Sequence, residues 1–257
     1  MTCVRTLEPS EAEPFLSLLC RVFDLDLSRA RSVFYSEPLY DLGRKWALFE
    51  DGEIRSILTT TGLEFGWGRA IGIAGVATDP VHRGRSLARH LIEEVLQAAE
   101  AAGEGPAILF AQSRDLYHRC GFEEIDEVVR GPIEADLDSE PGEPIGLEEV
   151  RQLYARWAAE SPERLVRTQA RWEYWVWSYR PAERFGPGYI CVEPSLVREA
   201  VPLHHSDRWP VSPGTEWVGL SRVIKALSVP VGPTSHELVL MGRGLPGPVQ
   251  MFMTDQF

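Results

Sequence analysis

One stretch of sequence, VATDPVHRGRSLARHL at residues 76–91, constrains the fold more than any other part of the chain. It overlaps an apolar run at residues 70–78 that predicts a strand, and it leads into residues 86–101, where apolar residues recur at helical spacing. The turn between them is rich in small and basic residues. A strand, a short turn and a helix start together expose backbone N–H groups that suit an anion. Arg83 and Arg85 add positive charge suited to a diphosphate.

Length, composition and charge limit the class of protein. The chain has 257 residues with 44% apolar and 25% charged content, which is ordinary for a globular protein with one large or two small domains. A net charge of −12 argues against nucleic acid as a partner, because no basic surplus exists to displace counterions, and it favours cationic small substrates. The four cysteines form no CxxC pair, so we expect no metal site and no disulfide framework. We find no signal peptide and no membrane-spanning run, and therefore predict a cytoplasmic protein without a membrane partner.

Apolar periodicity and turn residues predict the other elements. An acidic stretch with two prolines, residues 135–144, is interpreted as a linker, and the pattern of residues changes after it. We predict strands at residues 3–7, 45–50, 54–63, 70–78, 107–111, 122–130, 189–192, 196–200 and 237–241, and helices at residues 10–23, 28–35, 86–101, 115–120, 147–159, 162–179 and 216–227.

Two motifs in this order of elements carry a family resemblance. Residues 83–88 read RGRSLA, and residues 117–122 read YHRCGF. With these motifs, residues 1–133 resemble the GNAT superfamily of acetyl-CoA-dependent acyltransferases, whose phosphate loop is Arg/Gln-x-x-Gly-x-Gly/Ala and whose second motif is Tyr-x-x-x-Gly-Phe. Ser86 stands where the family usually has glycine, a mild departure because serine is small and can cap a helix. The resemblance implies an α/β (α+β) fold, a mixed twisted sheet flanked by helices.

A narrower resemblance is to the Eis-like branch of this superfamily, which has a similar run of residues around its phosphate loop. Members of that branch follow the first acetyltransferase unit with a degenerate second unit and a sterol-carrier-like domain. Residues 146–257 are too few for both. We therefore expect a catalytic domain at residues 1–133, followed by a smaller α+β unit at residues 146–257. One interpretation of this smaller unit is a degenerate GNAT-like domain.

The resemblance implies acetyl-CoA as the cosubstrate and indicates which residues bind it. The diphosphate would bind backbone N–H groups at the helix start, and the pantetheine amides would pair with an exposed strand edge. Alternatively, Arg83 and Arg85 are ordinary solvated charges, and Val76 and Leu87 also serve the core. The predicted cofactor-binding residues are Val76, Ala77, Thr78, Arg83, Gly84, Arg85, Ser86, Leu87, Ala88, Arg89, Gln112 and Ser113.

Acyl transfer to an amine requires a base, an oxyanion donor and an acid for the departing thiolate. Tyr117 resembles the family's general acid, since a phenol with a pKa of about 10 can protonate a thiolate whose conjugate acid lies near about 8.5. A backbone N–H in residues 76–78 is the expected oxyanion donor. Eis-like proteins use the carboxylate of an aromatic C-terminal residue as the base, and this chain ends in Phe257. The alternatives are that Tyr117 only packs a short helix and that the terminus is loose.

The predicted function is therefore acetyl transfer from coenzyme A to a primary amine of a small molecule or peptide, by direct attack through a tetrahedral intermediate. An inactive acyl-CoA-binding or structural protein with the same fold is the alternative, and a hydroxyl acceptor is a third. Asp24, Asp26 and Glu37 lie where family members bind acceptors, although a solvated acidic face is the simpler interpretation. An aromatic block at residues 172–179 is expected to pack the two units together or to line an acceptor pocket.

Overall fold

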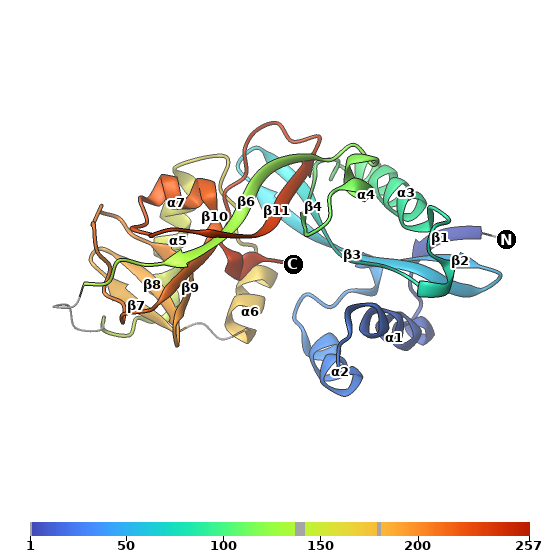
Figure 1. The fold of residues 1–257 in the computed structure, drawn as a ribbon, viewed down its shortest axis with the longest axis horizontal. Helices are drawn as coiled ribbons and strands as arrows, with labels where there is room; N and C mark the ends of the chain where they lie inside the picture. The colour runs from blue at the N-terminus through green and yellow to red at the C-terminus, as the bar shows by residue number, and fades with distance from the viewer. Residues whose placement is uncertain (1, 137–141, 179–180) are drawn as a thin grey trace.

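The computed structural model describes residues 2–136, 142–178 and 181–257, whose strands form one eleven-stranded mixed sheet (Figure 1). The strand order is β1-β2-β3-β4-β5-β11-β6-β10-β9-β8-β7. Neighbouring strands are antiparallel except for two parallel pairs, β4 with β5 and β9 with β10. The strands are β1 (Thr2–Thr6), β2 (Lys45–Glu50), β3 (Glu53–Phe65), β4 (Gly68–Thr78), β5 (Ala107–Ala111), β6 (Glu123–Pro132), β7 (Ala182–Phe185), β8 (Gly188–Glu193), β9 (Leu196–Val201), β10 (Glu216–Leu220) and β11 (Ser235–Arg243).

Helices flank this sheet, which confirms the predicted fold class. The first two helices pack on one face of the N-terminal strands, where Phe15 and Leu16 are buried, and α3 packs on the other face through residues such as Leu91 and Val95. No helix in the described ranges is both long and apolar enough to cross a bilayer. The helices are α1 (Ala12–Phe23), α2 (Leu27–Ser36), α3 (Leu87–Ala101), α4 (Asp115–His118), α5 (Leu147–Ala159), α6 (Gln169–Trp177) and α7 (Ser221–Leu227).

The C-terminal strand β11 lies between β5 and β6, far from its place in the sequence (Figure 1). Val239 of β11 is paired with Ala111 of β5 on one side and with Glu127 of β6 on the other. The last strand of the chain therefore completes the sheet that the first half begins. Because the sheet continues through both predicted units, their division into residues 1–133 and 146–257 stays a prediction.

The helix predicted at residues 162–179 is wrong over its first half. Residues 162–168 are not helical, because the N–H of Leu165 donates to the carbonyl of Gln250 (2.9 Å) and that of Val166 to the carbonyl of Glu64 (2.8 Å). Thr168 then caps α6 by accepting a hydrogen bond from the backbone N–H of Arg171. Position 179 of the predicted helix lies outside the described residues. Tertiary hydrogen bonds have overridden the local helical pattern here.

Two further predictions need correction. Residues 216–220, predicted as the start of a helix, form β10 because they pair with β6 and β9, and only residues 221–227 are helical. The short strand β7 was not predicted; it pairs with β8 as an edge of the sheet. Residues 137–141 of the predicted acidic linker lie outside the described residues.

Candidate active site

The turn between β4 and α3 has the backbone conformation of an anion-binding helix start. Ser86 occupies the N-cap position of α3 at φ 60°, without a capping hydrogen bond from its side chain, and Gly84 has φ 77°; these values favour glycine. Ser86 thus adopts a glycine-like conformation at the position where the GNAT motif has glycine. The N–H of His90 donates to the carbonyl of Ser86 (3.0 Å), so the three N–H groups before His90 lack partners within the helix. In a helix such N–H groups point toward its N-terminal end, where residues 83–86 are exposed.

The arginines around this turn differ in how they are neutralised. Arg85 forms two hydrogen bonds to Glu50 (2.7 and 2.8 Å), and Arg89 binds Glu93 one helical turn away (2.7 Å). Arg83 contacts a backbone carbonyl through Nε (3.5 Å), and no carboxylate of the described residues lies within ion-pair distance of it. Arg83 is therefore the arginine of this turn whose charge is left for a ligand.

Strands β4 and β5 separate next to this turn. Their parallel pairing joins residues 71–73 to residues 107–109, and the described residues show none beyond Ile73. The register between β3 and β4 shifts at this point, with one extra residue in β4 next to Gly75 (φ 61°), and a bulge of this kind bends its strand. The backbone edge of Val76, Ala77 and Thr78 that faces away from β3 is consequently open to β-type hydrogen bonds.

The side chains around this opening are consistent with ligand binding by backbone groups of β4. Val76 packs against the core under α3, and Ala77 is buried in the core under α1, so both side chains are occupied. Gln112 and Ser113 are exposed and directly follow β5, the strand on the far side of the opening. The structure thus places residues 76–78 on β4, and Gln112 and Ser113 just after β5, where the two strands are no longer paired.

Tyr117 lies on α4, which follows β5. The N–H of Phe122 donates to the carbonyl of Tyr117 (3.0 Å), and Gly121 allows this closed turn with φ 80°. The two rings also make an edge contact with centroids 6.2 Å apart, so Tyr117 does pack this short helix. Burial raises the pKa of the Tyr117 phenol above its ordinary value. The phenol is therefore protonated at neutral pH, as a general acid must be.

The C-terminus is packed rather than loose, and it lies near the centre of the molecule (Figure 1). Residues 251–255 are buried. The ring of Phe257 lies over Gly72 of β4, where a Cβ atom would come within 2.6 Å of it, and its centroid is 5.6 Å from that of Phe110 in β5. The last residue of the chain is therefore held where β4 and β5 begin to separate.

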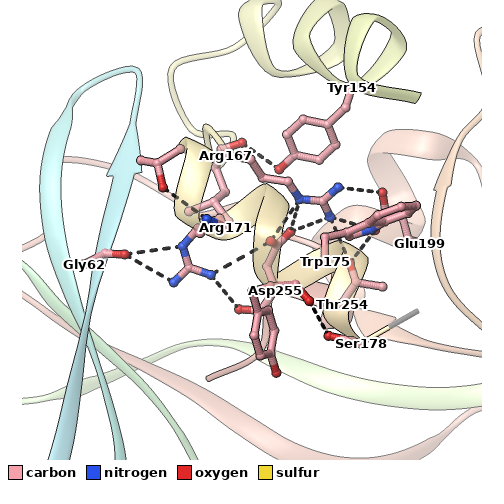
Figure 2. Close-up of polar contacts among 12 residues, drawn as sticks. Gly62, Tyr154, Arg167, Arg171, Trp175, Ser178, Glu199, Thr254 and Asp255 are labelled. Atoms are coloured by element: carbon pink, nitrogen blue, oxygen red, sulfur yellow. Dashed lines mark hydrogen bonds and ion pairs between the residues drawn. The ribbon is translucent and has the colours of Figure 1, made fainter. Parts of the chain in front are cut away.

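A buried ionic network holds this tail (Figure 2). The guanidinium of Arg167 lies between two carboxylates, and it binds Asp255 (2.8 and 3.0 Å) and Glu199 (2.7 and 2.9 Å). Burial raises the pKa of the Glu199 carboxyl, but the charge and hydrogen bonds of Arg167 outweigh it, so that the pKa is lowered overall. Glu199 also accepts hydrogen bonds from Trp175, Tyr189 and Thr254.

A second arginine of the network connects the tail to the N-terminal sheet. Arg171 donates to the carbonyl of Gly62 in β3 and to the carbonyl of Asp255 (3.3 Å each) (Figure 2). Together, Arg167 and Arg171 balance the charges of Glu199 and Asp255, and all four side chains are almost fully buried. The second half of the chain thereby fixes the position of the terminal residue relative to β3 and β4. The sequence analysis missed all four residues.

A cavity of about 580 Å³ lies between the α1–α2 pair and the sheet. Its lining includes Phe257 and the bulged residue Gly75, so the chain end and the β4 opening face the same space. Tyr174 of α6 also lines it, whereas Trp172 and Trp175 of the aromatic block are buried in the core shared by the two halves. The three carboxylates singled out in the sequence, Asp24, Asp26 and Glu37, all line this cavity.

A family model described as the GNAT acetyltransferase domain matches residues 3–125. This part of the chain is a GNAT acetyltransferase domain. The match ends before β11, although β11 completes the sheet of the GNAT domain between β5 and β6. The predicted family is confirmed.

Solved structures extend the likeness over nearly the whole chain. A GCN5-related N-acetyltransferase from Anabaena variabilis ATCC 29413 is similar with a TM-score of 0.70 and 18% identity, over 95% of this chain and 72% of that one. Eis1 from Mycobacterium abscessus has a TM-score of 0.62 and 17% identity, over 93% of this chain and 73% of that one. A putative acetyltransferase from Pyrococcus horikoshii has a TM-score of 0.66 and 12% identity, over 97% of this chain and 91% of that one. At these identities the likeness shows the fold alone, and no curated protein matches the sequence.

Proposed function

We propose that this GNAT protein is an acetyl-CoA-dependent N-acetyltransferase that acetylates a primary amine of a small molecule or peptide. The observation that carries the proposal is the open edge of β4. It adjoins an anion-binding turn at one end, and at its bulge it faces a cavity lined by carboxylates. A cofactor along this edge would have its diphosphate at the turn and its thioester at the cavity.

The cofactor would be held mostly by backbone groups. The diphosphate would accept hydrogen bonds from N–H groups of residues 84–89 and an ion pair from Arg83. The pantetheine amides would pair with the open edge of residues 76–78, with Gln112 and Ser113 opposite. The glycine-like conformation of Ser86 supports this role, because the departure from the family motif leaves the shape of the turn unchanged.

Acetyl transfer would then proceed in the cavity. The carboxylate of Phe257 takes a proton from the bound ammonium, and the neutral nitrogen attacks the thioester carbon to form a C–N bond. A backbone N–H of β4 stabilises the oxyanion, the C–S bond breaks, and Tyr117 protonates the departing thiolate. The nitrogen gives up its second proton as the amide forms, and this proton restores the phenol of Tyr117. Asp24, Asp26 and Glu37 attract the ammonium before this step.

Turnover assays test the proposal. Purified protein is mixed with acetyl-CoA and a panel of primary amines, each paired with the alcohol of the same carbon skeleton, and released thiol is measured. Acetylation of an amine supports the proposal. Acetyl-CoA binding without turnover on any acceptor would indicate an inactive binding protein, and turnover on alcohols alone would replace the amine by a hydroxyl.

Substituting Arg83→Ala should raise the KM for acetyl-CoA by about tenfold or more, because a charge-assisted hydrogen bond contributes about 1.5–3 kcal/mol. The value of kcat should change little, since Arg83 lies at the diphosphate end. Arg184→Ala is the matched control, because Arg184 is exposed and pairs with Glu149 in the second half of the chain. An unchanged KM in Arg83→Ala would make Arg83 an ordinary solvated charge.

Substituting Tyr117→Phe should lower kcat by about tenfold to a hundredfold, near the lower end of the range for general acids, because a thiolate is a good leaving group. The ring contact with Phe122 is retained, so the free energy of unfolding should stay close to that of the parent. Steady-state kinetics at neutral pH and a denaturation curve measure the two effects. Full activity in Tyr117→Phe would reduce Tyr117 to a packing residue.

A further inference from the structure

One face of α2 and the residues that flank it form a wall of the acceptor cavity. The lining residues Asp26, Ala30, Val33 and Glu37 follow one another at helical spacing. The wall is therefore apolar in its middle and has a carboxylate at each end, with Arg29 next to Asp26. Phe257 lines the same cavity.

Exposed apolar side chains gather around this cavity. Nine large apolar side chains of the described residues are exposed, and six of them lie on or between the helices that border it. Leu25 and Val33 line the cavity itself, although they are 50% and 46% exposed. Tyr174 of α6 lines it as well and stacks on the exposed ring of Trp177 (5.8 Å). The six exposed residues are Phe23, Leu25, Val33, Tyr35, Val176 and Trp177.

The charges of the cavity suit a ligand with one positive centre. Arg29 and Lys45 line it together with the carboxylates, and the ammonium of Lys45 lies 5.1 Å from the ring centroid of Phe34. Lys45 interacts electrostatically with Glu37, and Arg29 lines the cavity next to Asp26, so these cations oppose a second ammonium at either end of the wall. In the apolar middle, a second ammonium would be unpaired, which is costly. A single ammonium near Phe257 with an apolar remainder along α2 avoids both contacts.

We propose that the acceptor is a primary amine carried on an apolar body, an alkylamine or arylalkylamine, which Leu25 and Val33 select. This inference rests on the proposed N-acetyltransferase activity and names its substrate class. The apolar body would cover side chains that are now exposed, and the carboxylates would hold the ammonium in line with the thioester.

A chain-length series tests this proposal. The value of kcat/KM is measured for butylamine, hexylamine, octylamine, 2-phenylethylamine and spermidine at saturating acetyl-CoA. It should rise along the alkyl series, by up to about fourfold for each fully buried methylene, and it should be lowest for spermidine. The variants Leu25→Asn and Val33→Asn should raise the KM for octylamine several-fold more than that for butylamine. Both residues are exposed, so folding should be retained, and Leu147→Asn on α5, 37% exposed, is the matched control.

The outcomes separate this inference from the function on which it rests. A flat series, or faster acetylation of spermidine, would overturn the apolar acceptor while leaving N-acetyl transfer in place. An equal rise in the KM for butylamine and octylamine in Leu25→Asn and Val33→Asn would also overturn it. Failure to acetylate any amine would remove the proposed function, and the inference with it.

Discussion

Deleting Phe257 should lower kcat by about a hundredfold or more, because the terminal carboxylate then belongs to Gln256 and no longer occupies the position proposed for the general base. The KM for acetyl-CoA should stay near that of the parent protein, since the predicted diphosphate and pantetheine contacts lie at residues 76–89 and 112–113. The side chain of Phe257 is only half-buried, and the residues that anchor the tail, up to Asp255, remain. The fold should therefore survive. Steady-state kinetics, with acetyl-CoA binding measured by calorimetry, give the two quantities.

Two further variants distinguish the carboxylate from the ring. Adding one glycine after Phe257 keeps the ring and displaces the carboxylate, so kcat should fall nearly as far as in the deletion. Gly72→Ala introduces a methyl group where the ring now lies, at 2.6 Å, and should displace Phe257 as a whole. Full activity in the glycine-extended protein would exclude the terminal carboxylate as the base and direct attention to Asp24, Asp26 and Glu37 in the same cavity.

The cofactor half of the site could be predicted from the sequence because its parts are local. The turn at residues 83–86 lies between the end of β4 at Thr78 and the start of α3 at Leu87, and the turn that holds Tyr117 closes on Phe122 within six residues. Backbone propensity and small residues determine such turns. The structure also explains why Ser86 is tolerated, since it takes up φ 60° with its side chain exposed.

The buried network beside the acceptor cavity could not be predicted because residues far apart in sequence build it. Arg167 meets Asp255 across 88 residues, and Arg171 meets Gly62 across 109. Periodicity carries no information about such contacts, and it predicted a helix through Arg167 where tertiary hydrogen bonds hold an extended segment. The position of β11 between β5 and β6 likewise depends on tertiary pairing, which local sequence patterns do not report. The aromatic C-terminal residue was the one local sign of the tail's role.

Substituting Glu199→Ala should lower the free energy of unfolding by about 3–5 kcal/mol, the cost of removing one partner from a buried ion pair. The substitution leaves the Arg167 guanidinium with Asp255 as its remaining carboxylate partner, and it removes an acceptor from Trp175 and Tyr189. Urea denaturation measures the effect. Glu149→Ala is the control, because its exposed pair with Arg184 should contribute no more than about 1 kcal/mol.

The same network allows stability and positioning to be separated. Replacing Arg167 and Glu199 together by Met and Leu removes both charges, and such exchanges of buried pairs are often neutral or stabilising. The double variant should therefore recover much of the stability lost in Glu199→Ala. Its tail, however, loses the hydrogen bonds from Arg167 to Thr254 and Asp255. If the network positions the terminal carboxylate, kcat should stay low in the restored fold while the KM for acetyl-CoA is unchanged. Recovery of kcat together with stability would instead mean that the network contributes only to folding, and that the contact of Phe257 with Gly72 alone positions the base.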